Sequence, residues 1–438
     1  MYVSQRLVDA YEHIAIQDII LDVDTDKIDT VLSLLDSLHL TPFHFIQLKG
    51  LTFISINEVA ADILSVLGRD TAINAITPDV PITFGGIIAD SIAGSFQALR
   101  DGYRPKDFIT NKKLGQGRAS MAYDSFKQMK LIGTYELCEK YGLDAWDSIG
   151  VTGANSKVCV IDTGVQTTHS AFDGKNVEVI PVSKYKLDQY TDRSGHGTWC
   201  TGAVGGNDIE SPYGIRCRGT SRAKLCHVKA LRTPLGMSKK SDILTAIELA
   251  EKYMHPNIYS MSLGGAPTDG YENDPACKLI ASLPEKIFVV AAGNSGPAPQ
   301  TIDTPGISPN VVTVGSWSYT DDTVSWFSGR GPSIDALDKP DVYVYGGGRA
   351  DGKNRVMEYL FGPVSYLSME DTIDRKLKVF KPLNAFSGLM GTSMATPQMA
   401  GLIARMRDYK DGVLTTDDVL RNCVQHRPFN MSDFKELD

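Results

Sequence analysis

Apolar, β-branched runs alternate with helix-forming stretches along this 438-residue chain from residue 135 onward. The runs expected as strands are 158–161, 225–230, 258–263, 287–292 and 311–315. Between them, residues 242–253 carry apolar side chains at helical spacing. This alternation predicts an α/β fold with a doubly wound, mostly parallel sheet. Ligands of such sheets bind beyond the carboxyl ends of the strands, so functional side chains are expected there.

Glycine-rich turns place polar side chains at these strand ends and at helix starts. Asp162 ends the run 158–161 and precedes Thr-Gly, and His196 lies in a Gly-His-Gly-Thr turn. Asn294 follows Ala-Ala-Gly, and Ser393 lies in Gly-Thr-Ser-Met-Ala-Thr-Pro. A carboxylate, an imidazole, an amide and a hydroxyl are together the parts of an acyl-transfer site.

These motifs, in the chain order Asp, His, Ser, resemble those of the subtilisin-like serine proteases, the subtilases of peptidase family S8. The resemblance covers residues 146–426. It implies that His196 takes the proton of Ser393 while Asp162 orients the imidazole. It further implies that Asn294 donates a hydrogen bond to the oxyanion. A serine endopeptidase that hydrolyses peptide bonds is therefore expected.

The resemblance also implies where an extended peptide binds. One segment would pair with the peptide backbone, and a second would form the opposite wall of the pocket before the scissile bond. The expected substrate-binding residues are Ser262, Leu263, Gly264, Ala291, Ala292 and Gly293. Both walls are small and uncharged, which favours an apolar substrate side chain.

The first part of the chain shows a separate pattern. Extended runs at 16–23, 43–47, 51–56 and 72–82 flank helical runs at 26–40 and 58–67, which is a βαββαβ order. This order predicts a small α+β, ferredoxin-like domain, and it resembles the subtilase pro-domain that assists folding and inhibits the protease until it is cleaved. Residues 76–82 resemble the segment of that domain that lies in the active-site cleft.

Three regions are expected from these patterns. Residues 1–83 would form the pro-domain, 84–134 a linker or activation segment with an extension of the catalytic domain, and 135–438 the subtilisin-like catalytic domain. Helices are expected at 88–99 and 120–141. Residues 347–386 form a longer segment than is typical of the family, with a helical pattern at 369–378, and are expected near the active-site face.

Composition limits the classes of binding partner that we expect for this chain. The net charge of −8 and the sequence pI near 5.6, without a basic stretch, argue against a dedicated nucleic-acid binder. The sequence has no apolar run of membrane-spanning length and no secretory signal pattern, so we expect no membrane partner and a cytoplasmic protein. Extended polypeptides and the chain's own pro-domain are the expected partners.

Cysteine usage and metal ligands are less informative. The seven cysteines lack the spacing of a disulfide framework or metal site, which predicts buried, reduced thiols. Cys200 matches the thiol of the cysteine-containing branch of the family. The chemistry requires no cofactor. Many subtilases bind structural Ca²⁺, so calcium is a candidate ion without assigned ligands; acidic and amide side chains that could supply them include Asp188, Asp192, Asn207 and Asp208.

Two alternatives use the same residues. A subtilase-fold peptide ligase or cyclase would resolve the acyl-enzyme with an amine instead of water, and product mass would distinguish it. A catalytically silent scaffold is the second alternative. A site that has lost its activity usually lacks at least one of the four polar groups, and this chain retains all four.

Overall fold

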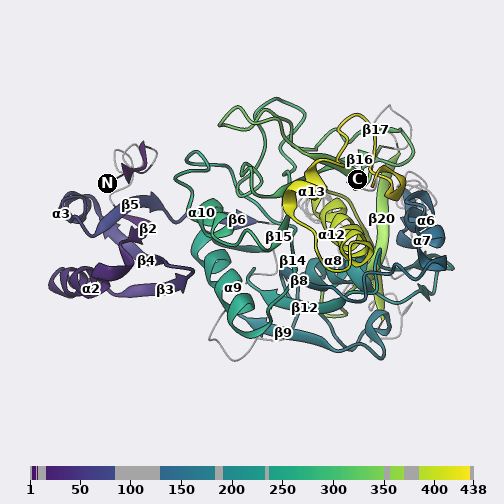
Figure 1. Ribbon diagram of the computed structural model, residues 1–438, viewed down its shortest axis with the longest axis horizontal. Helices are drawn as coiled ribbons and strands as arrows, with labels where there is room; N and C mark the ends of the chain where they lie inside the picture. Colours follow the sequence, from purple (N-terminus) through teal and green to yellow (C-terminus); the bar gives the residue numbers. More distant parts are fainter. Residues whose placement is uncertain are drawn as a thin grey trace, which may run out of the picture.

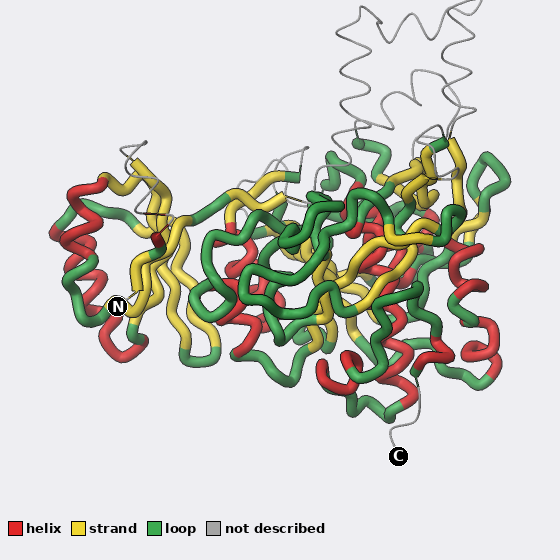
Figure 2. The backbone as a smooth tube through the Cα atoms, turned by 90° about the horizontal axis from the view of Figure 1, so that it is seen from above, coloured by secondary structure: helices red, strands yellow, loops and turns green. Residues whose placement is uncertain are grey.

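The chain folds into two units that lie side by side, a small N-terminal unit and a larger one (Figures 1 and 2). The computed structural model describes residues 2–5, 7, 16–83, 129–182, 191–231, 236–349, 356–368 and 384–434. The helices expected at 88–99 and 369–378 lie outside the described residues.

After one short additional strand at its start, the small unit has the expected βαββαβ order. Its elements are β1 (Tyr2–Val3), β2 (Ile16–Val23), η1 (Thr25–Lys27), α2 (Ile28–Ser37), β3 (Pro42–Leu48), β4 (Leu51–Ala60), α3 (Ala61–Leu67) and β5 (Ile73–Pro78). The sheet order is β1-β5-β2-β4-β3, with β2, β3, β4 and β5 paired antiparallel. The helix expected from residue 58 begins only at Ala61, because the buried Val59 still pairs with Gln17 of β2.

Alternation along β2 explains how the small unit packs. Ile19, Leu21 and Val23 point to a core shared with α2 and α3. Ile20 points to the opposite face and joins the core of the larger unit, together with Phe53. The helices therefore cover the outer face of this sheet, and the larger unit covers the inner face (Figure 2).

The larger unit is built on a mostly parallel sheet, as the sequence predicts. Its strands are β8 (Lys157–Asp162), β9 (Val177–Pro181), β12 (Lys224–Lys229), β14 (Ile258–Met261), β15 (Ile287–Ala291), β16 (Val312–Ser318), β17 (Thr323–Val324) and β18 (Val342–Tyr345). The order is β17-β16-β15-β14-β8-β12-β9, and β18 also pairs with β16. Only β17 is antiparallel to its neighbour. The strand order reverses beside β8, which is where the doubly wound fold places a site.

Helices cover both faces of this sheet (Figure 1). On one face lie α8 (His196–Gly205) and α12 (Thr392–Tyr409), which pack against each other. On the other lie α9 (Lys240–Tyr253) and α10 (Pro275–Ala281), next to the small unit. The remaining helices are α6 (Thr134–Lys140), α7 (Leu143–Ser148), α13 (Thr416–Leu420), η3 (Ser170–Phe172) and η4 (Met431–Asp433). Every residue of α12 from Thr392 to Met406 is buried, so this helix forms the centre of the core.

A smaller sheet corrects one expectation, the helix at 120–141. It contains β7 (Met129–Gly133), β19 (Gly348–Arg349), β20 (Met357–Val364) and β21 (Ala385–Leu389). Strand β7 replaces part of the helix expected at 120–141 and pairs parallel with β20. Strand β7 falls in the segment 84–134, for which an extension of the catalytic domain is expected, and its pairing ties it to β20, upstream of α12. Residues 120–128 lie outside the described part.

Short ribbons connect the remaining segments. They are β6 (Pro81–Thr83), β10 (Ile209–Glu210), β11 (Arg216–Cys217) and β13 (Met237–Lys239). The seven cysteines are free thiols, and only Cys423 is not fully buried. Among the described residues, no helix has the length and apolar character that crossing a membrane requires.

Candidate active site

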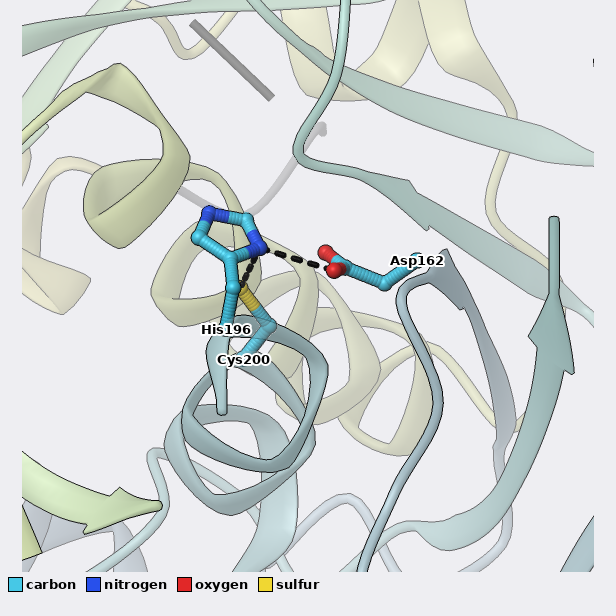
Figure 3. A group of neighbouring side chains, drawn as sticks. All are labelled: Asp162, His196 and Cys200. Atoms are coloured by element: carbon cyan, nitrogen blue, oxygen red, sulfur yellow. Dashed lines mark hydrogen bonds and ion pairs between the residues drawn. The ribbon is translucent and has the colours of Figure 1, made fainter. Parts of the chain in front are cut away.

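Asp162 and His196 form a buried hydrogen-bonded pair (Figure 3). Asp162 ends β8, and His196 begins α8 after Gly195, whose φ of +89° favours glycine. His196 Nδ1 lies 2.7 Å from Asp162 Oδ1, and both side chains are at most 1% exposed. Because a carboxylate only accepts hydrogen bonds, Nδ1 is the donor, which leaves Nε2 as the atom that can take up a proton. The Thr163 N–H donates to the same carboxylate oxygen at 2.7 Å.

A second carboxylate holds the helix that carries His196. Both oxygens of the buried Asp192 accept hydrogen bonds, from the N–H groups of Ser194, Gly195 and Thr198 and from the hydroxyls of Thr163 and Thr198. These bonds satisfy N–H groups at the start of α8 that lack partners within the helix. Asp192 therefore positions His196, a role that the sequence did not indicate.

Ser393 is the second residue of α12. The preceding Gly391 has φ +151°, a conformation that disfavours other residues, and a Cβ there would lie 3.3 Å from Asn294 Nδ2. Ser393 Oγ donates to Ser262 O at 3.2 Å, and Ser262 Oγ donates to Ser393 O at 2.9 Å. These reciprocal bonds tie the nucleophile candidate to the end of β14. The helix start also directs backbone N–H groups toward this point.

Asn294 lies beside Ser393 with a defined amide orientation. Its Oδ1 accepts from the Thr392 N–H at 2.9 Å and from the Thr392 hydroxyl at 3.1 Å. Two donors to one atom identify that atom as oxygen, so Nδ2 is the free end that faces Gly391. The amide is thus held as a hydrogen-bond donor next to the Ser393 backbone.

Cys200 lies beside His196 (Figure 3). It follows His196 by one helical turn, and its Sγ is 3.7 Å from His196 Nδ1 and 3.6 Å from Ser393 O. Burial raises the pKa of this thiol well above its ordinary value. Among the described residues, Asp162, His196 and Cys200 are a group whose metal-ligand atoms all lie within 4.8 Å of one another. The Asp162–His196 hydrogen bond and the helical spacing of Cys200 account for this proximity.

The calcium candidates do not gather at one described position. The carboxylate of Asp192 already accepts hydrogen bonds at the start of α8. Asp208 pairs with Arg216, and Asn207 donates to the carbonyl of Asp173. Asp188 lies outside the described residues. Calcium binding stays a prediction.

The expected substrate-binding segments flank Ser393, and part of the small unit lies on one of them. Residues 262–264 follow β14, and residues 291–293 end β15 and continue to Asn294. The Thr83 N–H donates to Gly264 O at 2.9 Å, and the Gly264 N–H donates to Thr83 O at 2.8 Å. Strand β6 pairs antiparallel with β13 on its other side. Residues 81–83 therefore occupy an extended, substrate-like position between two backbone segments of the larger unit.

Comparisons with known proteins show which family this chain resembles. A sequence profile of the subtilase family matches residues 153–428. The serine protease AprX of Bacillus subtilis is 34% identical over 287 residues, which is 61% of this chain and 60% of that protein. The subtilisin-like serine protease Rho m 2.0101 of Rhodotorula mucilaginosa is 30% identical over 272 residues, covering 59% of this chain and 64% of that protein. The chain thus matches less than two thirds of the length of either relative.

A solved structure shares the fold. Fervidolysin from Fervidobacterium pennivorans, described as a keratinolytic enzyme related to subtilisin, matches with a TM-score of 0.65 at 16% identity. The match covers 99% of this chain and 62% of that chain. This coverage includes the small unit.

Proposed function

This chain belongs to the subtilase family, and we propose that it is a serine endopeptidase that hydrolyses extended polypeptides. Ser393 Oγ attacks the carbonyl carbon of the scissile bond, and His196 Nε2 takes its proton. The imidazolium then returns the proton to the leaving amine, and water resolves the acyl-enzyme by the same route. The observation that carries this proposal is the buried 2.7 Å contact between His196 Nδ1 and Asp162 Oδ1.

Asn294 stabilises the charge that develops during attack. Its Nδ2 and the Ser393 N–H are the donors assigned to the oxyanion. The amide needs no reorganisation for this task, because the two hydrogen bonds from Thr392 already orient it.

Reactivity of Ser393 tests the proposal. A fluorophosphonate should label wild type at Ser393 and leave Ser393→Ala unlabelled, and only wild type should cleave an unstructured polypeptide. Cleavage products that carry the mass of an added water indicate hydrolysis, whereas joined peptides indicate ligation. A wild-type chain that stays unlabelled after removal of its small unit contradicts the proposal.

We infer, in addition, that the small unit is an inhibitory pro-domain removed by self-cleavage. Its segment 81–83 lies where an extended substrate would pair, and polar contacts anchor it on the helices of the larger unit. The anchoring contacts pair Asp79 with Ser241, Asp18 with Lys239, His44 with Asp242, and Asp22 with Lys278. A substrate cannot pair with Gly264 while Thr83 occupies its backbone groups.

Intact mass of wild type and Ser393→Ala, incubated side by side, tests this role. We expect only wild type to lose an N-terminal fragment, and sequencing of the new N-terminus locates the junction. Equal processing of both proteins would show that another protease makes the cut.

A further inference from the structure

Asp303 lies in the loop between β15 and β16 and closes the space between the two substrate-binding segments. Its N–H donates to Ala292 O at 3.0 Å. The next residue, Thr304, exchanges backbone hydrogen bonds with Gly265, at 2.8 and 3.2 Å. The loop therefore joins the segment 291–293 to Gly265, which directly follows the segment 262–264.

The carboxylate of Asp303 lies against both segments. A Cβ placed on Gly293 would lie 2.4 Å from Asp303 Oδ2, and one placed on Gly264 would lie 3.2 Å from the same oxygen. Any larger residue at Gly293 would collide with the carboxylate. The two glycines thus leave room for Asp303 to present a charged group between segments that are otherwise small and uncharged.

This carboxylate has no counter-charge among the side chains that the structure describes. Across the described residues, no hydrogen bond or ion pair reaches the Asp303 side chain. The residue is half-buried, and the backbone of Gly264 and Gly293 packed against its carboxylate keeps that group poorly solvated. Other buried acids differ: Asp274 pairs with Lys240 at 2.8 Å, and Asp192 accepts several hydrogen bonds. Burial alone raises the pKa of Asp303 to about 7. A poorly solvated acid without a partner, beside a reactive site, indicates a ligand that supplies the partner.

The route of an extended peptide leads to this carboxylate. Thr83 shows the pairing, because it lies antiparallel opposite Gly264. A substrate in this register reaches Ser262 two residues later, and Ser262 O is 3.2 Å from Ser393 Oγ. The attacked carbonyl then lies between Ser262 and Asn294. The side chain of that residue enters the space between the two segments, where the Asp303 carboxylate lies.

We propose that Asp303 selects a lysine or arginine side chain at the residue whose carbonyl Ser393 attacks. This inference rests on the proposed endopeptidase function. The substrate cation neutralises a carboxylate that no described side chain neutralises, and its aliphatic stem packs against the apolar walls. This preference for a basic side chain replaces the apolar preference that the uncharged walls alone indicated.

Matched peptide substrates test the selection. Peptides that differ only in arginine or leucine at the cleaved position are compared by kcat/KM at pH 8.5, for wild type, Asp303→Asn and Glu272→Gln. The last variant removes an exposed acid that follows the segment 262–264 by eight residues in the chain. We expect wild type and Glu272→Gln to prefer arginine by at least about tenfold, as a desolvated charge pair allows, and Asp303→Asn to lose that preference.

The pH dependence gives a second readout. The ratio of the two kcat/KM values cancels ionisation steps common to both substrates, including that of His196. For wild type, this ratio should fall as the pH drops through 7, because Asp303 becomes neutral. The ratio for Asp303→Asn should stay flat.

Fluorophosphonate labelling separates the two proposals. A labelled wild type that prefers leucine, or an arginine preference that survives in Asp303→Asn, overturns the selection and leaves the proposed function intact. A wild type that is never labelled overturns the proposed function, and the selection falls with it.

Discussion

The side-chain oxygen of Asn294 accepts both the backbone N–H and the hydroxyl of Thr392, at 2.9 and 3.1 Å. Thr392 directly precedes Ser393, so one residue connects the nucleophile candidate to the oxyanion donor. The hydroxyl bond can be removed by mutation, whereas the backbone bond cannot. This connection makes the contribution of amide orientation measurable.

Asn294→Ala should lower kcat by about two to three orders of magnitude with little change in KM, because the donor acts mainly in the transition state. Steady-state kinetics on a single peptide substrate measures this change. Thr392→Val keeps the backbone bond and loses the hydroxyl bond, so we expect a loss of about tenfold or less. A larger loss in Thr392→Val than in Asn294→Ala would contradict the assigned roles.

Mercuric ions should inhibit the enzyme through Cys200. A metal bound to its sulfur would lie within reach of His196 Nδ1 and disturb the contact with Asp162. Residual activity after incubation with HgCl₂ measures the effect. The variant Cys200→Ala should keep its activity in HgCl₂. Cys423→Ala, which removes the most accessible thiol, should remain as sensitive as wild type. Full activity of wild type in excess mercurial would contradict this mechanism.

Asp79 should hold the small unit on α9. Its carboxylate accepts from the Ser241 N–H at 3.0 Å and from the Ser241 hydroxyl at 2.7 Å, at the start of that helix. In a Ser393→Ala background, Asp79→Ala should speed hydrogen exchange at the first turn of α9 by about tenfold or more, which follows from losing charged hydrogen bonds of about 1.5–3 kcal/mol.

The control for this exchange experiment is Asp24→Ala. Asp24 is a cap within the small unit, where its carboxylate accepts from the Asp26 N–H. This variant should leave exchange in α9 unchanged. Equal exchange rates in both variants would show that Asp79 does not anchor the unit.

Asp303 should reduce stability above neutral pH. Burial raises its pKa from an ordinary value of 3.8 to about 7, so the folded state binds the proton more tightly than the unfolded state. The free-energy cost is absent below pH 3.8, grows as the pH rises, and is complete above 7. Asp303→Asn should therefore raise the free energy of unfolding by about 1–3 kcal/mol at pH 8.

Thermal unfolding of the Ser393→Ala protein, with and without Asp303→Asn, measures this difference without self-digestion. At pH 4 the two proteins should unfold at nearly the same temperature. A destabilising effect of Asp303→Asn at pH 8 would indicate that the carboxylate has a stabilising partner.

Local sequence was sufficient to predict the parts of the site that lie next to strand ends and helix starts. The apolar run before Asp162 predicts a strand, and the glycines around His196 and Ser393 predict tight entries to helices. The βαββαβ order of the small unit and the parallel sheet follow from periodicity in the same way. These features depend on neighbours in the chain, so a single sequence contains them.

Tertiary structure decided the contacts between distant segments. Nothing near Asp303 in the sequence indicates that its carboxylate lies against Gly264 and Gly293, since backbone pairing with Ala292 and Gly265 places it there. Strand β7 was expected as helix because its pairing partner, β20, is far along the chain. The sequence by itself determined which chemical groups stand at the ends of its strands and helices. Packing decided which of them meet, because side chains brought together by the sheet leave no periodic trace in the chain.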